Sequence, residues 1–513
     1  MNKNLQLIFN LISNNKIHEA NDLIENYKFT LDELNEVNFL KGVINLNQKK
    51  YSKSINFFKK NINSKKLQID SVNNICLILQ KKNKKKILSK LINLLLSFKP
   101  KNNYIFFNIA IIYDFLGDFD KSLKIINEIK DANAEVIAFQ ASIFRKKNLI
   151  TEALKIINNY KKDKGSYYLL KEKASCLAYV EKFDEALKIV NTLIQKYPED
   201  KSLLFSKSTY LLALEKYKSA VKLFDYRFEK NQSKEKFPLK KKLWNGEKNN
   251  KILIWSEDGL GDHILYLKLV EFVSNVNEKH LIIDKRLHHL YKNYLLKKKI
   301  TNIHIVNQKI NLNNYDSHIP AGSLMKFIDF NNLKKISYLQ PKKKMVLNDN
   351  FINIGIAWKT LNKDQSFRSL PFAKIINLLS NFSNIKIYNL QFGDIEDEKK
   401  FCRENNINLN ICNNIDYTND INRVASLISG LDFVISSQNT VAHLSSAIGK
   451  KVLLLLPIGH RWYWNFNKKD KLDKWYKNTF VFKQNTINSW EETLDELKNE
   501  LSEISKNPSF YRI

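Results

Sequence analysis

The hydrophobic and polar positions of this chain follow two patterns, and the change between them falls near residue 251. Before it, a short unit recurs in which an apolar residue follows a turn, a small residue stands three positions later and an aliphatic residue comes next. After it, short apolar runs alternate with helical stretches. The first pattern predicts helical hairpins, and the second predicts parallel sheets with helices on both faces.

The recurring unit of the first half is regularly spaced. Its copies read Ile17-His-Glu-Ala20, Tyr51-Ser-Lys-Ser54, Phe119-Asp-Lys-Ser122, Ile150-Thr-Glu-Ala153, Phe183-Asp-Glu-Ala186 and Tyr217-Lys-Ser-Ala220, with a degraded copy at Lys85 to Leu88. Successive copies begin 31 to 34 residues apart, which is the period of tetratricopeptide (TPR) repeats. We therefore predict a TPR solenoid over residues 1–228, whose concave groove binds a protein partner. A spacer or dimerisation arm is the alternative reading of the same array.

The second half predicts two lobes that follow a linker. Residues 229–250 are polar, rich in Lys and interrupted by Pro238. Strands are predicted at 251–255, 280–284, 352–358, 385–391, 431–436 and 451–456, and helices at 263–273, 371–379, 419–429 and 440–447. Two strand series predict two Rossmann-like lobes, at residues 251–345 and 346–513, with ligands at the carboxyl ends of their strands.

The first candidate ligand loop is Gly259-Leu-Gly261-Asp262, between a predicted strand and a predicted helix. The two glycines allow backbone N–H groups to approach a ligand, and a helix N-terminus favours negative charge. Asp262 has two readings from its position, either the cap of that helix or a general base that takes a proton from an acceptor hydroxyl. The glycine spacing is not the dinucleotide fingerprint, which disfavours a nicotinamide cofactor.

The second candidate loop runs from Ser436 to Thr440 and is followed by His443. Its polar side chains, Gln438, Asn439 and Thr440 among them, stand at a helix N-terminus, where they can bind a phosphate or a sugar. His443 lies one turn inside the helix, either near the same ligand or as a satisfied core residue. Further on, His460-Arg461-Trp462 follows a strand end, where these residues either line the cleft or pack through their rings.

Charge and cysteine content narrow the function classes. The formal net charge of +32 comes from Lys residues spread along the whole chain, so we expect no nucleic-acid partner. The four cysteines have no framework spacing, which is typical of a reducing cytoplasm. We expect no signal peptide and no transmembrane segment, although peripheral association with a membrane stays open.

Both loops, together with the motifs between and after them, carry a resemblance to a known family. These motifs are Trp255-x-Glu257-x-Gly259-Leu-Gly-Asp262, Gly355-Ile-Ala-Trp358, Arg368-Ser-Leu-Pro371, Asn389-Leu-Gln391, Gly430-Leu-Asp432-Phe-Val-Ile435, Thr440-Val-Ala-His443-Leu, Gly449-Lys and Leu454-Leu-Leu-Pro457. Over about residues 250–490 the chain resembles bacterial TPR proteins fused to a domain similar to the ADP-heptose:lipopolysaccharide heptosyltransferases, a glycosyltransferase family 9-like domain of GT-B fold.

The resemblance implies roles for individual residues. Asp262 matches the proposed catalytic base, Thr360, Lys363 and Arg368 lie where a phosphate-binding loop is expected, and Thr440 and His443 lie in the donor loop. The family's donor loop usually has an aspartate where this chain has Gln438, so a carboxylate able to hold sugar hydroxyls is missing.

Our leading hypothesis is an inverting, metal-independent glycosyltransferase that uses a nucleotide-sugar donor and a glycan or protein acceptor. Asp262 would deprotonate the acceptor, while Lys363, Arg368 and the helix beginning near Thr440 would stabilise the departing diphosphate. No metal or other cofactor is expected, because the clear Asp-x-Asp pair, Asp118 and Asp120, falls in a repeat turn. The alternative is a catalytically inactive TPR scaffold that retains a GT-B fold, which the Gln438 difference favours. A third hypothesis, by analogy with other fusions, is a protein glycosyltransferase whose repeats hold a polypeptide acceptor.

Overall fold

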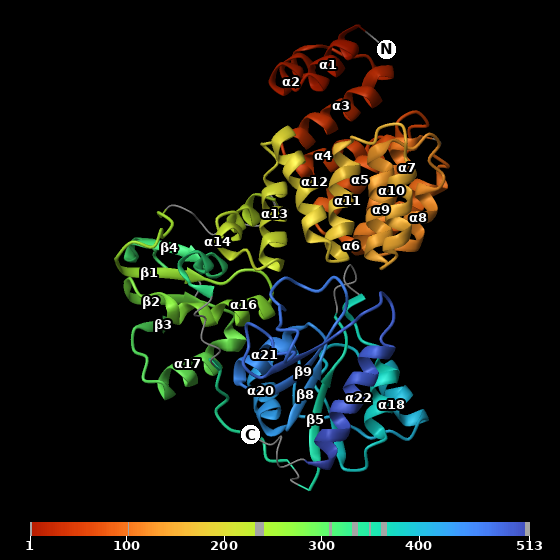
Figure 1. Ribbon diagram of the computed structural model, residues 1–513. Helices are drawn as coiled ribbons and strands as arrows, with labels where there is room; N and C mark the ends of the chain where they lie inside the picture. Colours follow the sequence, from red (N-terminus) through yellow and green to blue (C-terminus); the bar gives the residue numbers. More distant parts are fainter. Residues whose placement is uncertain are drawn as a thin grey trace. The chain divides into compact units, whose positions relative to one another are not determined.

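The computed structural model describes residues 3–100, 102–230, 241–306, 310–330, 337–347, 350–360 and 367–507. By internal contacts the chain divides into two compact units, 1–147 with 151–164 and 148–150 with 165–513. Each unit is described by itself (Figure 1).

The first unit consists of paired helices. They are α1 (Lys3–Ser13), α2 (Ile17–Asn26), η1 (Leu31–Glu33), α3 (Leu34–Asn47), α4 (Tyr51–Lys59), α5 (Gln68–Lys81), α6 (Lys85–Ser97), α7 (Asn103–Leu116), α8 (Phe119–Ile126), α9 (Ala134–Lys146) and α10 (Ile150–Asn159). The array continues in the second unit with α11 (Tyr167–Tyr179), α12 (Phe183–Lys196), α13 (Lys201–Ala213), α14 (Tyr217–Ala220), η2 (Phe224–Tyr226) and α15 (Arg227–Lys230). The predicted TPR-like helical repeat is confirmed.

The first residue of each copy of the repeated unit, here called its anchor, is also the first residue of a helix. Two positions before each anchor the backbone is left-handed, with φ between 54° and 78°, at Asn15, Lys49, Asn83, Gly117, Asn148, Glu181 and Glu215. Only one of these is glycine, so the turn is repeated by backbone geometry rather than by residue type. The small residue of the unit is fully buried between paired helices, and where it is Ser54 or Ser122 its hydroxyl donates to a carbonyl of the preceding helix.

The rest of the second unit contains two parallel sheets (Figure 1). The first sheet has the order β3-β2-β1-β4, and the second has the order β10-β9-β8-β5-β6-β7. Elements of the first lobe are β1 (Asn249–Trp255), α16 (Leu260–Leu267), η3 (Lys268–Phe272), β2 (Val276–Ile282), η4 (Lys285–Leu287), α17 (His288–Lys297), β3 (Ile303–Ile305), η5 (Leu312–Asn314), β4 (Ser317–Pro320) and η6 (Ala321–Phe327).

The second lobe follows with the elements β5 (Ile352–Ala357), α18 (Phe372–Ser380), β6 (Ile385–Asn389), α19 (Glu396–Glu404), β7 (Leu409–Asn410), α20 (Ile421–Gly430), β8 (Phe433–Ser436), α21 (Thr440–Ile448), β9 (Lys451–Leu456), β10 (Thr479–Lys483) and α22 (Glu491–Lys506). Parallel α/β architecture is therefore confirmed. The helix predicted at 263–273 has different bounds in the structure. It begins earlier, at Leu260, and from Lys268 it continues as the 3-10 helix η3.

The division into units does not follow the predicted domain boundary at residue 228. Helices α11–α14 share one apolar core with both α/β lobes, a core that includes Leu212, Phe224, Ile254 and Val452. Residues 241–250, expected in the linker, also belong to the first lobe, since Trp244 is buried and its N–H donates to the His318 carbonyl of β4 at 2.9 Å. Residues 231–240 of that linker lie outside the described residues. Within the described residues, no helix is both long and apolar enough to cross a bilayer.

Candidate functional site

The two loops singled out from the sequence meet in the structure. The first joins β1 to α16 and the second joins β8 to α21, so two helices begin at the carboxyl ends of strands from different sheets. A Cβ built on Gly261 would lie 3.1 Å from Cδ2 of His443 and 3.7 Å from Oγ1 of Thr440. Glycine at position 261 thus permits the close approach of α16 and α21.

Asp262 caps the start of α16, which is one of the two roles considered for it. Its carboxylate accepts the Gly259 N–H at 3.2 Å, as in a capping box at the start of α16. Burial, and next the negative charge of Asp258, raises the pKa of Asp262 to about 6, although Arg461 and the Gly259 N–H act in the opposite direction. A carboxylate with a pKa of about 6 is ionised at neutral pH and is a better proton acceptor than an ordinary aspartate.

Two arginines interact electrostatically with this carboxylate. Burial, and next the like charge of Arg461, lowers the pKa of Arg368 to about 9. The Nε–H of Arg368 is buried and has no hydrogen-bond partner among the described residues. A buried guanidinium that a second positive charge destabilises, with one donor unused, is the arrangement that an anionic ligand would stabilise.

The second loop is held largely by its own side chains. The Asn439 side-chain oxygen accepts the N–H groups of Val441 and Ala442 at 2.9 and 3.3 Å, so Asn439 caps α21. The Gln438 side-chain oxygen accepts the Arg461 N–H at 3.0 Å, while its amide nitrogen is buried with no partner among the described residues. Gln438 therefore positions the backbone of Arg461 and leaves one donor free.

His443 is a buried core residue. Its Nδ1 lies 2.8 Å from the Tyr476 hydroxyl, and its ring stacks on Trp464 with centroids 4.5 Å apart. Burial lowers the pKa of His443 to about 3, so the imidazole is neutral at physiological pH. Of the two readings from the sequence, the geometry favours a packing role for His443, on the wall against Gly261.

The loop expected to bind phosphate is described only in part. The Thr360 N–H donates to the Ser369 hydroxyl at 3.2 Å, which joins this residue to the segment carrying Arg368. Lys363 lies outside the described residues. The Gln391 side-chain oxygen accepts the N–H groups of Trp358 and Lys359 at 3.0 and 2.9 Å, so this glutamine caps the end of β5.

Glu257 of the first motif has a structural role. It forms a buried bidentate ion pair with Arg227, with distances of 2.5 and 2.6 Å, and also accepts the Gly322 N–H at 3.1 Å. Arg227 belongs to the last repeat segment, so this pair joins the end of the repeats to the first lobe. This ion pair could not be predicted from the sequence, because Arg227 lies 30 residues before Glu257 and in a helix of the repeat region rather than in the α/β region.

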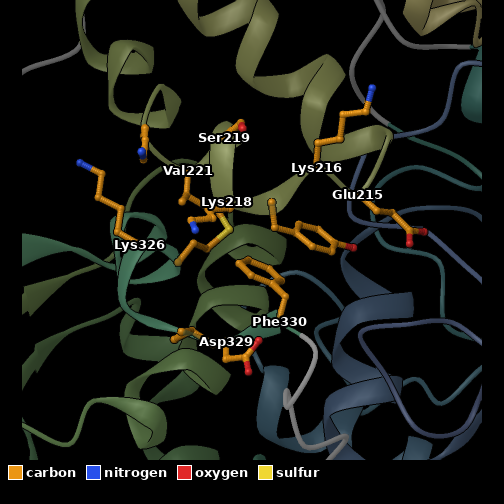
Figure 2. Close-up of a pocket in the computed structure, with 12 residues that line it drawn as sticks. Glu215, Lys216, Lys218, Ser219, Val221, Lys326, Asp329 and Phe330 are labelled. Atoms are coloured by element: carbon orange, nitrogen blue, oxygen red, sulfur yellow. The ribbon is translucent and has the colours of Figure 1, made fainter.

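A cavity of about 810 Å³ opens between α14 and the segment after β4 (Figure 2). Lysines predominate among its charged residues, which are Glu215, Lys216, Lys218, Lys222, Lys326 and Asp329. Tyr217 and Phe330 stack in parallel at 4.2 Å. Both rings also line a smaller adjoining cavity that reaches Trp462 and Tyr463. The Tyr463 ring packs near His443, with centroids 5.3 Å apart, so the smaller cavity extends toward the candidate site.

Comparison with known proteins gives likenesses to parts of this chain. The model of the coatomer epsilon subunit family matches residues 20–237, less than half of the chain. Protein FlbA of Caulobacter vibrioides is 22% identical over 348 residues, which cover 60% of this chain and 56% of FlbA. The chain thus spans little more than half of this curated relative.

Two solved structures are each similar to about half of this chain at low identity. A TPR protein from Parabacteroides merdae is 16% identical, covers 47% of this chain and 88% of its own, and has a TM-score of 0.35. The heptosyltransferase WaaC of E. coli with ADP is 12% identical, covers 50% of this chain and 99% of its own, and has a TM-score of 0.30. By its own elements, the described part of the chain is a TPR-like helical repeat followed by a parallel-sheet α/β region.

Proposed function

We propose that the α/β region, as a GT-B domain, transfers a glycosyl group from a nucleotide-activated sugar to an acceptor hydroxyl, inverting the anomeric centre without a metal ion. The observation that carries the proposal is the electrostatic interaction of Asp262, whose pKa burial raises to about 6, with the guanidinium groups of Arg368 and Arg461. The motif resemblance of residues 250–490 agrees with this assignment.

Each of these residues has a defined part in the proposed reaction. The acceptor hydroxyl loses its proton to the Asp262 carboxylate as its oxygen forms a bond to the anomeric carbon. The bond from that carbon to the diphosphate oxygen breaks on the opposite side. The negative charge that develops on the diphosphate is stabilised by Arg368, by Arg461 and by the N-terminus of α21.

Gln438 does not argue against this reaction. Its amide oxygen holds the backbone of Arg461, and its unused amide N–H donor suits a ligand oxygen, such as a sugar hydroxyl or a phosphate. A donor site that contacts the sugar through an amide is therefore consistent with the described geometry. The lysine-rich cavity at α14 provides a route for an acceptor, on the side of the site that Tyr463 borders.

The proposal is tested by donor hydrolysis, in which water replaces the unidentified acceptor. The purified full chain is incubated with UDP-, GDP-, ADP- and CMP-sugars, and nucleotide release is followed with and without magnesium. Wild-type protein should release the nucleotide from one donor class, Asp262→Asn should lose at least a hundredfold, and Asp495→Asn, at an exposed aspartate of α22, should retain activity. Equal turnover by Asp262→Asn would rule out this base. If no donor is turned over or bound, the scaffold alternative is favoured, with the repeat groove as the functional surface.

A further inference from the structure

Three potential metal ligands gather on one face of the first sheet, away from the loops described above. Glu278 and His280 are two residues apart on β2, so both side chains point to the same face. His304 of the edge strand β3 pairs directly with His280 in the parallel register. The same face carries Leu253, Trp255 and Ile282, whereas Ile252, Ile254 and Leu281 belong to the core on the other side.

The donor atoms of these three residues are already close together. One ligand atom from each lies within 4.8 Å of the other two. The His280 Nε2 is 3.3 Å from a Glu278 carboxylate oxygen, and the rings of His280 and His304 are 5.0 Å apart at 55°. Small side-chain rotations would bring all three atoms to the 2.0–2.2 Å distances of a zinc ion, roughly as in other sites with nitrogen and carboxylate ligands.

The second nitrogen of His280 also has a suitable partner. Its Nδ1 lies 3.2 Å from the Tyr315 hydroxyl, which can accept a hydrogen bond from Nδ1–H or donate one to an unprotonated Nδ1. When Nδ1–H donates to that hydroxyl, the lone pair of Nε2 faces Glu278. Metal-binding histidines characteristically have such an outer partner, because it fixes the tautomer and the ring orientation.

We propose that Glu278, His280 and His304 bind a divalent transition metal ion, with zinc as the physiological candidate and water as the fourth ligand. Two imidazoles favour zinc over magnesium or calcium, which prefer oxygen ligands. The competing interaction is the ion pair between Lys251 and Glu278, 3.1 Å long, so we expect a dissociation constant of about 1 μM rather than tighter binding.

The ion would have a structural role. It would join β3, an edge strand of only three residues, to β2 through side chains as well as through the backbone. The site lies on a sheet face rather than at the carboxyl ends of the strands, so it is separate from Asp262 and does not depend on glycosyl transfer.

The test is calorimetric titration of the tag-free, chelator-treated full chain with zinc chloride, and separately with magnesium chloride. We expect one zinc ion per chain and no magnesium at this site. His280→Ala and His304→Ala should each weaken zinc binding at least tenfold. The matched control is His289→Ala, an exposed histidine of α17, which should bind zinc as wild type does.

Cobalt provides a second readout that does not depend on affinity alone. Cobalt-loaded wild-type protein should show visible absorption bands of a four-coordinate ion, and these bands should be lost in His304→Ala, whose folding is checked by circular dichroism. No saturable zinc binding by wild type, or binding that survives both histidine substitutions, would overturn the proposal.

Discussion

Replacing Asp262 with asparagine should stabilise the protein while it removes the proposed activity. The carboxylate has its pKa raised from the ordinary 3.8 to about 6, mainly by burial. A raised acid pKa means that the folded state disfavours the charged form. The stability that the neutral form provides is complete below pH 3.8 and is lost as the pH rises through 6.

The size of the effect follows from the two pKa values. At pH 7 the ionised carboxylate costs about 3 kcal/mol in the free energy of unfolding, and at pH 5 about half of that, since the group is then mostly protonated when folded. These are upper limits, because Asp262 is only half-buried and water screens part of the penalty. Asparagine keeps an oxygen that can accept the Gly259 N–H, so the start of α16 should not change.

The assay is urea unfolding of wild type and Asp262→Asn at pH 5, 7 and 8, monitored by tryptophan fluorescence, since Trp255 lies at the end of β1. We expect the variant to unfold at higher urea, with a gap of 1–3 kcal/mol, roughly, that widens between pH 5 and pH 7. Asp495→Asn, at an exposed aspartate of α22, is the control and should show no comparable gap. A variant that is less stable than wild type, or a gap independent of pH, would refute the burial argument.

Substitutions at three further positions test other parts of the site. Arg368→Ala should weaken binding of the nucleotide by about 10- to 100-fold in calorimetry, the loss of one charge-assisted contact, and unchanged affinity would contradict the anion site. Gly261→Val should lower nucleotide affinity at least tenfold, because the valine side chain would meet His443. Gly261→Ala should lower the affinity less. If both variants bound the nucleotide as wild type does, the close approach of α16 and α21 would be refuted. Glu257→Gln should lower the free energy of unfolding by about 3 kcal/mol, measured by urea unfolding, since Arg227 loses its buried partner; a loss below about 1 kcal/mol would show that the ion pair contributes little.

The helical repeat could be predicted because its information is local and periodic. Each anchor, from Ile17 to Tyr217, begins a helix. The left-handed turns before the anchors could not be predicted by residue type, because residues as different as Asn15 and Glu181 occupy them. Short strands such as β7, with two residues, carry too little pattern to be seen in the sequence.

The sequence predicted the two loops, and the family resemblance implied Asp262 and Arg368 in one site, but the electrostatic environment of Asp262 could not be predicted. Strand ends followed by glycine or by capping residues placed Gly261 and Thr440 correctly at helix starts. The pKa of Asp262 depends on burial and on Arg461, which comes from a loop nearly 200 residues away. The apolar core that joins α11–α14 to the sheets could not be predicted for a similar reason, since its contacts are tertiary.

Binding of free nucleotides to wild type tests the central claim most directly. UDP, GDP, ADP and CMP would each be titrated calorimetrically into the full chain, with and without magnesium, and Arg368→Ala would be titrated in parallel. The account predicts saturable binding of one nucleotide at about 1 μM, equivalent to about −8 kcal/mol, independent of magnesium and weakened in the variant. Absence of binding across the panel, or binding that Arg368→Ala leaves unchanged, would contradict it.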